Sequence, residues 1–269
     1  MIPTTETRSA PAGPRSGEPD PAADRLRLLE RLLSDTLLDA AAAARPPAPV
    51  PAHLRRAPDD GPLIGLPEPA APHAALDDVL PGRSAAHEYA PTALTGAEVS
   101  ALFAAADRMD ARGWPAEREA GVDLELYCAA WRVTGVDTGL YRYRPERSGL
   151  CRVASLPDGP QAEELVLQRE FAQAAALLVI TGNLAAALAR HGSHGHRLLL
   201  SRAGAAGHAA WLTALRLDLV GTVFAGLLPH VLRERAGADG YHRAALFAFA
   251  VGHPPGTAVS YRSTVAGPD

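Results

Sequence analysis

Proline is distributed unevenly along this 269-residue chain, and the distribution limits where regular structure can form. Of the 24 prolines, 15 lie within the first 81 residues. Proline lacks a backbone N–H and its ring clashes with the preceding helical turn, so a segment this rich in it cannot form a long helix or a central strand. We therefore assign residues 80–269 to one folded domain that follows a Pro-rich N-terminal extension.

The N-terminal extension divides into two parts. Residues 1–21 contain Pro, Gly, Ser and charged side chains without periodicity, and such a segment buries too little apolar surface to offset its ordering entropy. We expect it to be a disordered tail. Residues 22–79 begin with leucines three or four positions apart, which predict one amphipathic helix over residues 24–45, and continue as a Pro-rich connector.

Residues 80–269 carry short β-rich runs that alternate with helical patterns. The longest uncharged run, residues 171–189, contains a Thr-Gly-Asn turn, so it predicts a strand followed by a helix rather than a membrane span. Hairpin strands with segregated helices indicate an α+β fold, in which an antiparallel or mixed sheet is flanked by helices. The predicted strands are 124–133, 139–143, 150–153, 177–181, 221–224 and 244–252, and the predicted helices are 95–111, 161–174, 197–217 and 229–235.

Composition excludes several functions. The formal net charge is −4, whereas a protein that binds a nucleic acid backbone carries a basic excess, so no nucleic acid partner is expected. All 26 basic residues are arginine, which excludes a phosphate loop with its lysine and an enzyme that forms a lysine Schiff base. Two cysteines and an N-terminus without an apolar stretch favour a cytoplasmic protein with no membrane partner.

Three histidines, His191, His194 and His196, fall within six residues of a segment that contains Gly and Ser. Such a cluster could bind a divalent metal, could supply a general base, or could simply be solvated. No acidic residue lies nearby in the sequence to complete a metal site. We therefore predict no metal and keep a histidine base as a hypothesis.

Three longer strings resemble the nitroreductase-like superfamily of FMN-dependent proteins, and within it the azoline dehydrogenases of the SagB type. The first is WRVTGVDTGLYRYRPERSGL at residues 131–150, which is similar to the family's succession of strand, hairpin and strand. The second, residues 195–226, resembles its long central helix and the glycine-rich strand after it. The third, LFAFAVGHPP at residues 246–255, resembles its last core strand. The resemblance implies a nitroreductase-like fold with FMN as the cofactor.

The resemblance also implies which residues would contact FMN. Arg83 and Ser84 match the start of the family's motif on the flavin phosphate and ribityl chain, although the second arginine of that motif is replaced here by Ala86 or His87. Arg262 occupies the place of a C-terminal arginine that binds the phosphate. Gly226 corresponds to a glycine whose backbone approaches the flavin ring.

The catalytic candidates follow from the same resemblance. Azoline dehydrogenases carry a Lys-Tyr pair just before the central helix, and the aligned residues here are Arg190 and His191. Arginine could hold the charge and histidine could take a proton, so His191 is the candidate base. A second departure is the family's Pro-Ser-x-Gly motif on the flavin ring, which is absent from residues 113–125.

The resemblance implies a dehydrogenase that oxidises thiazoline or oxazoline rings to azoles in a ribosomally made peptide, with that modified peptide as substrate. Family members form dimers with flavin at the interface, which implies a homodimer or a heterodimer with a related subunit. A peptide cyclodehydratase is a further expected partner. The missing motifs leave two alternatives open: a non-catalytic scaffold with an eroded flavin site, and a general NAD(P)H-dependent nitroreductase.

Overall fold

The computed structural model describes residues 21–37, 46–55, 62–156, 166–227, 232–234 and 237–256. The chain separates into two compact units, Met1–Ala44 and Arg45–Asp269, and each is described by itself. The predicted tail lies outside the described residues except for Pro21. The predicted connector, where it is described, belongs to the larger unit.

In the smaller unit, Pro21–Asp35 form the helix α1, which is the described part of the predicted amphipathic helix. Residues 38–45 of that prediction lie outside the described ranges. Thr36 follows α1, and its hydroxyl donates a hydrogen bond to the carbonyl of Leu32 at 2.8 Å. The leucines that define the pattern are exposed: Leu26, Leu28, Leu29, Leu32 and Leu33.

In the described part of the larger unit, seven strands form one sheet in the order β1-β4-β3-β2-β5-β7-β6. All pairs of neighbouring strands are antiparallel, so the antiparallel form of the predicted sheet is confirmed. β5 lies inside the sheet between β2 and β7 and is buried at every position, which explains why residues 177–180 of the predicted strand are all apolar. The strands are β1 (Leu63–Gly65), β2 (Leu124–Ala130), β3 (Gly139–Arg144), β4 (Gly149–Ala154), β5 (Ala176–Gly182), β6 (Val220–Phe224) and β7 (Ala244–Gly252).

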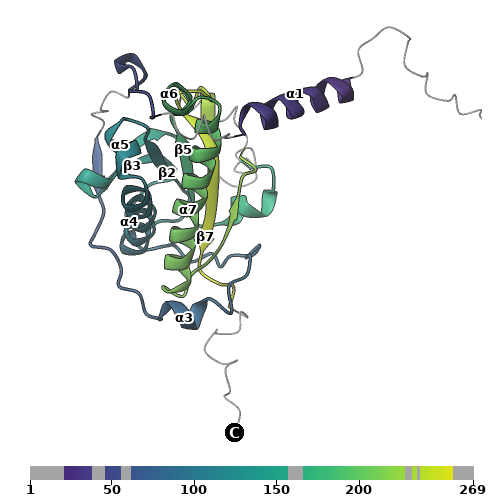
Figure 1. Cartoon of the computed structure of the whole chain (residues 1–269). Helices are drawn as coiled ribbons and strands as arrows, with labels where there is room; N and C mark the ends of the chain where they lie inside the picture. Colours follow the sequence, from purple (N-terminus) through teal and green to yellow (C-terminus); the bar gives the residue numbers. More distant parts are fainter. Residues whose placement is uncertain are drawn as a thin grey trace, which may run out of the picture. The chain divides into compact units, whose positions relative to one another are not determined.

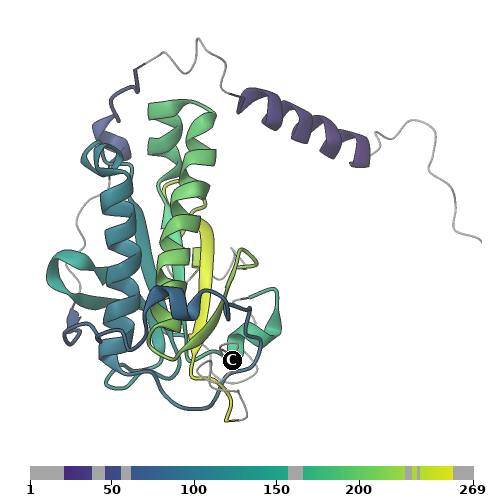
Figure 2. The same cartoon turned by 60° about the horizontal axis from the view of Figure 1, so that its bottom comes forward.

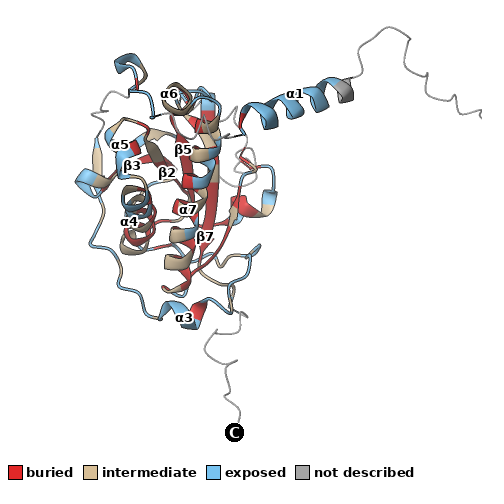
Figure 3. Cartoon of the chain, viewed as in Figure 1, coloured by how far each residue is buried: buried red, intermediate tan, exposed pale blue. Residues whose placement is uncertain are grey.

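Two long helices cover one face of the sheet. They are α4 (Gly96–Gly113) and α7 (His194–Leu215), which run side by side (Figures 1 and 2). Successive residues of a strand point to opposite faces, so Leu178 and Ile180 of β5 join the core beneath these helices. Leu177 and Val179 join a second core on the other face. The inner strands β3, β2, β5 and β7 are therefore buried over most of their length (Figure 3).

Polar side chains fix where the helices near the candidate residues begin. The backbone N–H of Thr95 donates to the Glu98 carboxylate at 2.6 Å, and the Thr95 hydroxyl accepts from the Glu98 N–H at 3.2 Å, which starts α4. Asn183 accepts the N–H of Ala186 at 3.0 Å and starts α6 (Leu184–His191). The predicted strand, turn and helix over residues 171–189 are thereby confirmed.

One predicted element was wrong, and one strand was not predicted. The helix expected over residues 161–174 is, where described, an isolated bridge at Val166 and the short 3-10 helix η4 (Arg169–Gln173). Phe171 packs in the second core and β5 begins only five residues later, at Ala176, so the chain between them has room for only one tight turn. The strand β1 lies in the Pro-rich connector and forms because the edge of β4 is open to it, with Ile64 opposite Leu150.

Short helices complete the larger unit: η1 (Ala52–Leu54), α3 (Leu76–Val79), α5 (Pro115–Glu119) and η2 (Pro145–Arg147). The helix predicted over residues 229–235 lies mostly outside the described residues. Within the described ranges, none of the helices combines the length and the apolar character needed to cross a membrane.

Candidate functional site

The segment that carries the first cofactor candidates, residues 83–90, lies along the ends of β6 and β7. The N–H of Ala86 donates to the carbonyl of Gly221 at 3.3 Å, and the hydroxyl of Thr222 donates to the carbonyl of Ala86 at 2.7 Å. The N–H of Ala90 donates to the carbonyl of His253 at 2.9 Å. These bonds hold the segment on the sheet edge although it has no regular structure of its own.

Arg83 lies on the ring of Trp211, near the C-terminal end of α7. Its guanidinium carbon is 4.5 Å from the ring centre, which is the geometry of a cation–π contact. The Trp211 side chain is buried, and within the described residues its indole nitrogen has no hydrogen-bond partner. Arg83 itself is exposed, so its N–H donors face solvent and can reach an anion.

The residues that replace the second arginine of the motif have other partners. His87 stacks on Phe171 at 5.7 Å, and its Nδ1 is 3.5 Å from a carboxylate oxygen of Glu170. Two residues further on, the hydroxyl of Tyr89 donates to the carbonyl of Ala86 at 3.0 Å, and burial raises the pKa of Tyr89 well above its usual value. Tyr89 is therefore a neutral structural donor.

Gly226 follows β6, and the surrounding chain already occupies the space where a side chain would stand. Its carbonyl accepts the N–H of Leu167 at 2.7 Å. A Cβ atom at Gly226 would lie 2.9 Å from the side-chain oxygen of Gln168. Arg262, the remaining cofactor candidate, lies outside the described residues.

The catalytic candidates meet at a carboxylate that the sequence analysis did not single out. Arg190 and His191 end α6, and both contact Oε2 of Glu117 in α5: Arg190 Nε at 3.0 Å and His191 Nε2 at 2.7 Å. Burial opposes ionisation of Glu117, but hydrogen bonds and charges of these two neighbours outweigh it and lower the pKa of the carboxyl. The side chains of all three are at most 15% exposed.

A segment from the predicted connector covers this cluster. The N–H of Ala48 donates to the carbonyl of Arg190 at 2.9 Å, and Arg190 Nη1 donates to the carbonyl of Ala48 at 3.1 Å. The next residues bury Val50 against the main core. Only the tertiary structure shows that the connector and α6 share these bonds.

Within one chain, the structure does not bring the cofactor and catalytic candidates together. The Glu117 cluster is formed by α5 and α6, and α6 directly precedes α7 in the chain, whereas Arg83 contacts Trp211 in the last turns of α7. At about 1.5 Å per residue, the stretch of α7 from His194 to Trp211 spans roughly 25 Å.

The histidine cluster is divided. His191 contacts Glu117, whereas Nδ1 of His194 is buried and has no hydrogen-bond partner within the described ranges. Among the residues that the structure describes, no group of three or more His, Cys, Asp or Glu side chains is arranged to hold a metal ion. The metal hypothesis for this cluster therefore has no geometric support.

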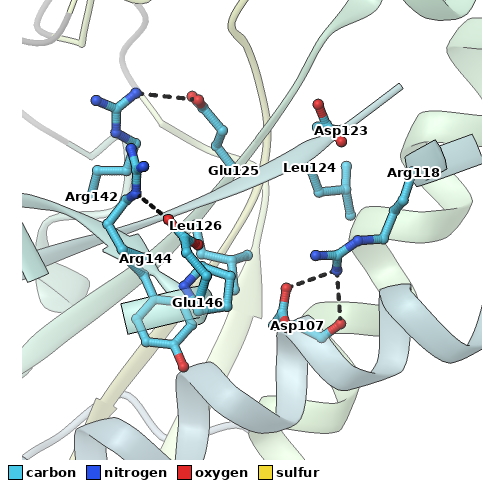
Figure 4. Close-up of a pocket in the computed structure, with 11 residues that line it drawn as sticks. Asp107, Arg118, Asp123, Leu124, Glu125, Leu126, Arg142, Arg144 and Glu146 are labelled. Atoms are coloured by element: carbon cyan, nitrogen blue, oxygen red, sulfur yellow. Dashed lines mark hydrogen bonds and ion pairs between the residues drawn. The ribbon is translucent and has the colours of Figure 1, made fainter. Parts of the chain in front are cut away.

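A charged cleft of about 320 Å³ that sequence reasoning missed opens beside β2 and β3 (Figure 4). Its arginines are already paired with carboxylates: Arg118 with Asp107 at 2.7 Å, Arg142 with Glu125 at 3.3 Å, and Arg144 with Glu146 at 2.7 Å. The local sequence gives no signal for the cleft, because the paired residues come from separate elements. A ligand there would have to displace these ion pairs.

Comparisons with known proteins fit this fold. A chain of a protein from Anabaena variabilis assigned as a nitroreductase superposes with a TM-score of 0.67 at 20% identity, over 85% of this chain. The match spans 47% of the Anabaena chain, so this chain corresponds to about half of its length. A chain of the Escherichia coli microcin synthetase McbBCD complex, with truncated pro-MccB17 bound, superposes with a TM-score of 0.51 at 17% identity, over 88% of this chain and 95% of that one. These likenesses define the class: an α+β protein with the nitroreductase-like fold, as predicted.

Sequence similarity places the chain within that class. It is 34% identical over 155 residues to a Methanocaldococcus jannaschii protein assigned as a nitroreductase, a match over 56% of this chain and 78% of the relative. No model of a known protein family matches the chain. The chain belongs to the nitroreductase family, and this membership indicates a flavin oxidoreductase.

Proposed function

We propose that this chain is an FMN-dependent dehydrogenase that oxidises thiazoline or oxazoline rings to azoles in a ribosomally made peptide. The observation that carries the proposal is the exposed guanidinium of Arg83, held over the buried ring of Trp211. The peptide substrate is supported by the string at residues 131–150 and by the fold shared with a chain of the microcin synthetase complex.

The described residues fit the phosphate end of FMN. A planar guanidinium pairs two phosphate oxygens, and Trp211 restricts Arg83 so that little side-chain freedom remains to be lost on binding. Ser84 would add its hydroxyl, and Gly226 would offer backbone to the ring end. When bound, FMN supplies a two-electron acceptor that no side chain of this protein can supply.

A second copy of the chain would complete the site. In a two-fold symmetric dimer whose axis crosses α7 near its middle, the Arg83 end of one copy lies beside the His191 end of the other. Each site of such a dimer takes Arg83 from one copy and His191 from the other, so the two residues need not be close within one chain. A related subunit in place of the second copy would serve the same geometry.

Residues of this chain would remove the proton from the substrate ring. Converting an azoline to an azole removes one proton and one hydride from the ring, and the hydride and its two electrons leave to the cofactor. The proton needs a base, and His191, held against Glu117, would accept it. Arg190 keeps a positive charge at the same carboxylate.

One observation favours the non-catalytic scaffold as a second candidate. The space above Gly226, which a flavin ring would approach, already holds the Gln168 side chain. The 34% identity to a protein assigned as a nitroreductase favours a third, the general NAD(P)H-dependent nitroreductase. The three functions differ in whether flavin binds and in what reduces it.

A visible absorption spectrum of the purified full chain, with the released cofactor identified by mass, separates the first two. We expect FMN at about one per chain after incubation with excess FMN. Mixing the loaded protein with an azoline peptide under anaerobic conditions should bleach the flavin band in one turnover. Absence of bound flavin would support the non-catalytic scaffold. Bleaching of the flavin band by NADH but not by the peptide would support the general nitroreductase.

A further inference from the structure

Glu117 joins the two candidate catalytic side chains. It lies in α5, a helix of five residues, and its carboxylate is buried beneath α6 and the segment around Ala48. Oε2 receives both Nε of Arg190 and Nε2 of His191. Burial opposes ionisation, but the hydrogen bonds from both groups and the charge of Arg190 lower the pKa of Glu117, so the carboxylate is ionised at neutral pH.

An ionised carboxylate decides which ring nitrogen of His191 carries hydrogen. Carboxylate oxygens can only accept, so the 2.7 Å contact requires a hydrogen on Nε2. In a neutral imidazole the other nitrogen is then bare and acts as the acceptor. The bare atom is Nδ1, and the His191 side chain is 15% exposed.

We propose that Glu117 is a positioning residue, which holds His191 in the tautomer with hydrogen on Nε2 and so presents Nδ1 as the atom that takes the substrate proton. This inference rests on the proposed function, because it assigns a proton acceptor for that reaction. The first ring C–H bond breaks, its proton bonds to Nδ1, and its electron pair forms the new double bond of the ring. The second C–H bond breaks and its electron pair leaves with the hydride to FMN.

Arg190 and the covering segment keep Glu117 in place. The guanidinium of Arg190 bonds both Oε2 of Glu117 and the carbonyl of Ala48, so the carboxylate is tied to the covering segment as well as to His191. A carboxylate held by two donors in a buried site cannot rotate freely, and the imidazole it binds is oriented with it.

The tautomer can be measured without substrate or flavin. The ¹⁵N chemical shifts of His191 in the full chain at pH 8, assigned with His191→Ala, should show hydrogen on Nε2 and a bare Nδ1. In Glu117→Ala the two tautomers should mix. Hydrogen on Nδ1 in the unmodified protein, or a doubly protonated ring at that pH, would overturn the proposal without any variant being needed.

Activity gives the second readout. Glu117→Ala should retain FMN and KM but lower kcat by about 10- to 100-fold, part of the 10²–10⁴-fold that a general base contributes. Glu119→Ala, in the same helix but exposed, is the matched control and should keep full activity. Unchanged kcat in Glu117→Ala would refute the positioning role. If the unmodified protein binds no FMN, the proposed function fails instead, which the absorption spectrum reports separately.

Discussion

Arg202 of α7 and Asp110 of α4 form a buried two-armed ion pair, with Nε to Oδ1 at 2.7 Å and Nη2 to Oδ2 at 2.9 Å. The third nitrogen, Nη1, donates to the carbonyl of Val122 at 2.9 Å, just before β2. Arg202 is fully buried, and Asp110 is nearly so. The pair therefore connects the two helices that cover the sheet to the strand beneath them.

Removing one member of this pair should be costly. Asp110→Ala leaves a buried guanidinium uncompensated, so we expect the free energy of unfolding in urea to fall by about 3–5 kcal/mol. Arg112→Ala, exposed on the same helix, should change it by less than about 0.5 kcal/mol. The double variant Asp110→Leu with Arg202→Met should recover most of the loss, and equal losses in single and double variants would contradict the ion-pair explanation.

Arg83→Ala tests the phosphate contact. Loss of a charge-assisted bond should weaken FMN binding by about 1.5–3 kcal/mol, measured by fluorescence titration of FMN. Arg147→Ala, an exposed arginine in η2, controls for the loss of one positive charge and should leave the affinity unchanged. Equal affinities of all three proteins would remove Arg83 from the site.

Two glycines of the β6 region should behave differently. A Cβ at Gly221 would collide with the carbonyl of Ala250 and the ring of Phe249, which cannot move without disturbing β7, so Gly221→Ala should destabilise the fold by about 2–4 kcal/mol. Gly226→Ala meets the end of the Gln168 side chain at 2.9 Å, which can move, and Cβ of Leu167 at 3.3 Å, so thermal unfolding should show a loss below about 1 kcal/mol. A weaker FMN affinity in Gly226→Ala, despite this small loss, would place Gly226 at the flavin.

The lowered pKa of Glu117 makes a pH prediction. Because the carboxyl binds its proton less readily when folded, its contribution to stability is complete above the unfolded value near 4.5 and is lost as pH falls through the folded value below it. Urea unfolding from pH 7 to pH 3 should therefore show Glu117→Gln destabilised at pH 7 and the difference shrinking below about pH 4.5. A difference that stays constant with pH would mean that the charge does not contribute.

Complementation tests whether two chains share one site. In a dimer with the proposed geometry, Arg83→Ala and His191→Ala damage opposite halves of each site. An equal mixture, unfolded and refolded together, should regain about a quarter of the activity, because half of the dimers are mixed and each holds one intact site. Activity no higher than that of the separate variants would place both halves within one chain.

Local patterns in the sequence determined most of the fold. Apolar alternation, turn residues and the cap of α4 act between residues that are close along the chain, so they can be recognised from the sequence alone. They predict the strands β2, β3, β4, β5, β6 and β7 and the start of α4. The family resemblance added the class, which the Methanocaldococcus relative confirms.

Tertiary structure decided the contacts made between distant segments. β1 pairs with the open edge of β4, and Glu117 contacts Arg190 and His191 more than 70 residues further along the sequence. Ala48, in the connector, bonds Arg190 from a still more distant position. A buried charge needs a partner, and the fold can supply that partner from any distant segment, so sequence spacing does not predict which residues will pair. The length of α7, which separates Arg83 from His191, could likewise be interpreted only once the contacts at its two ends were known.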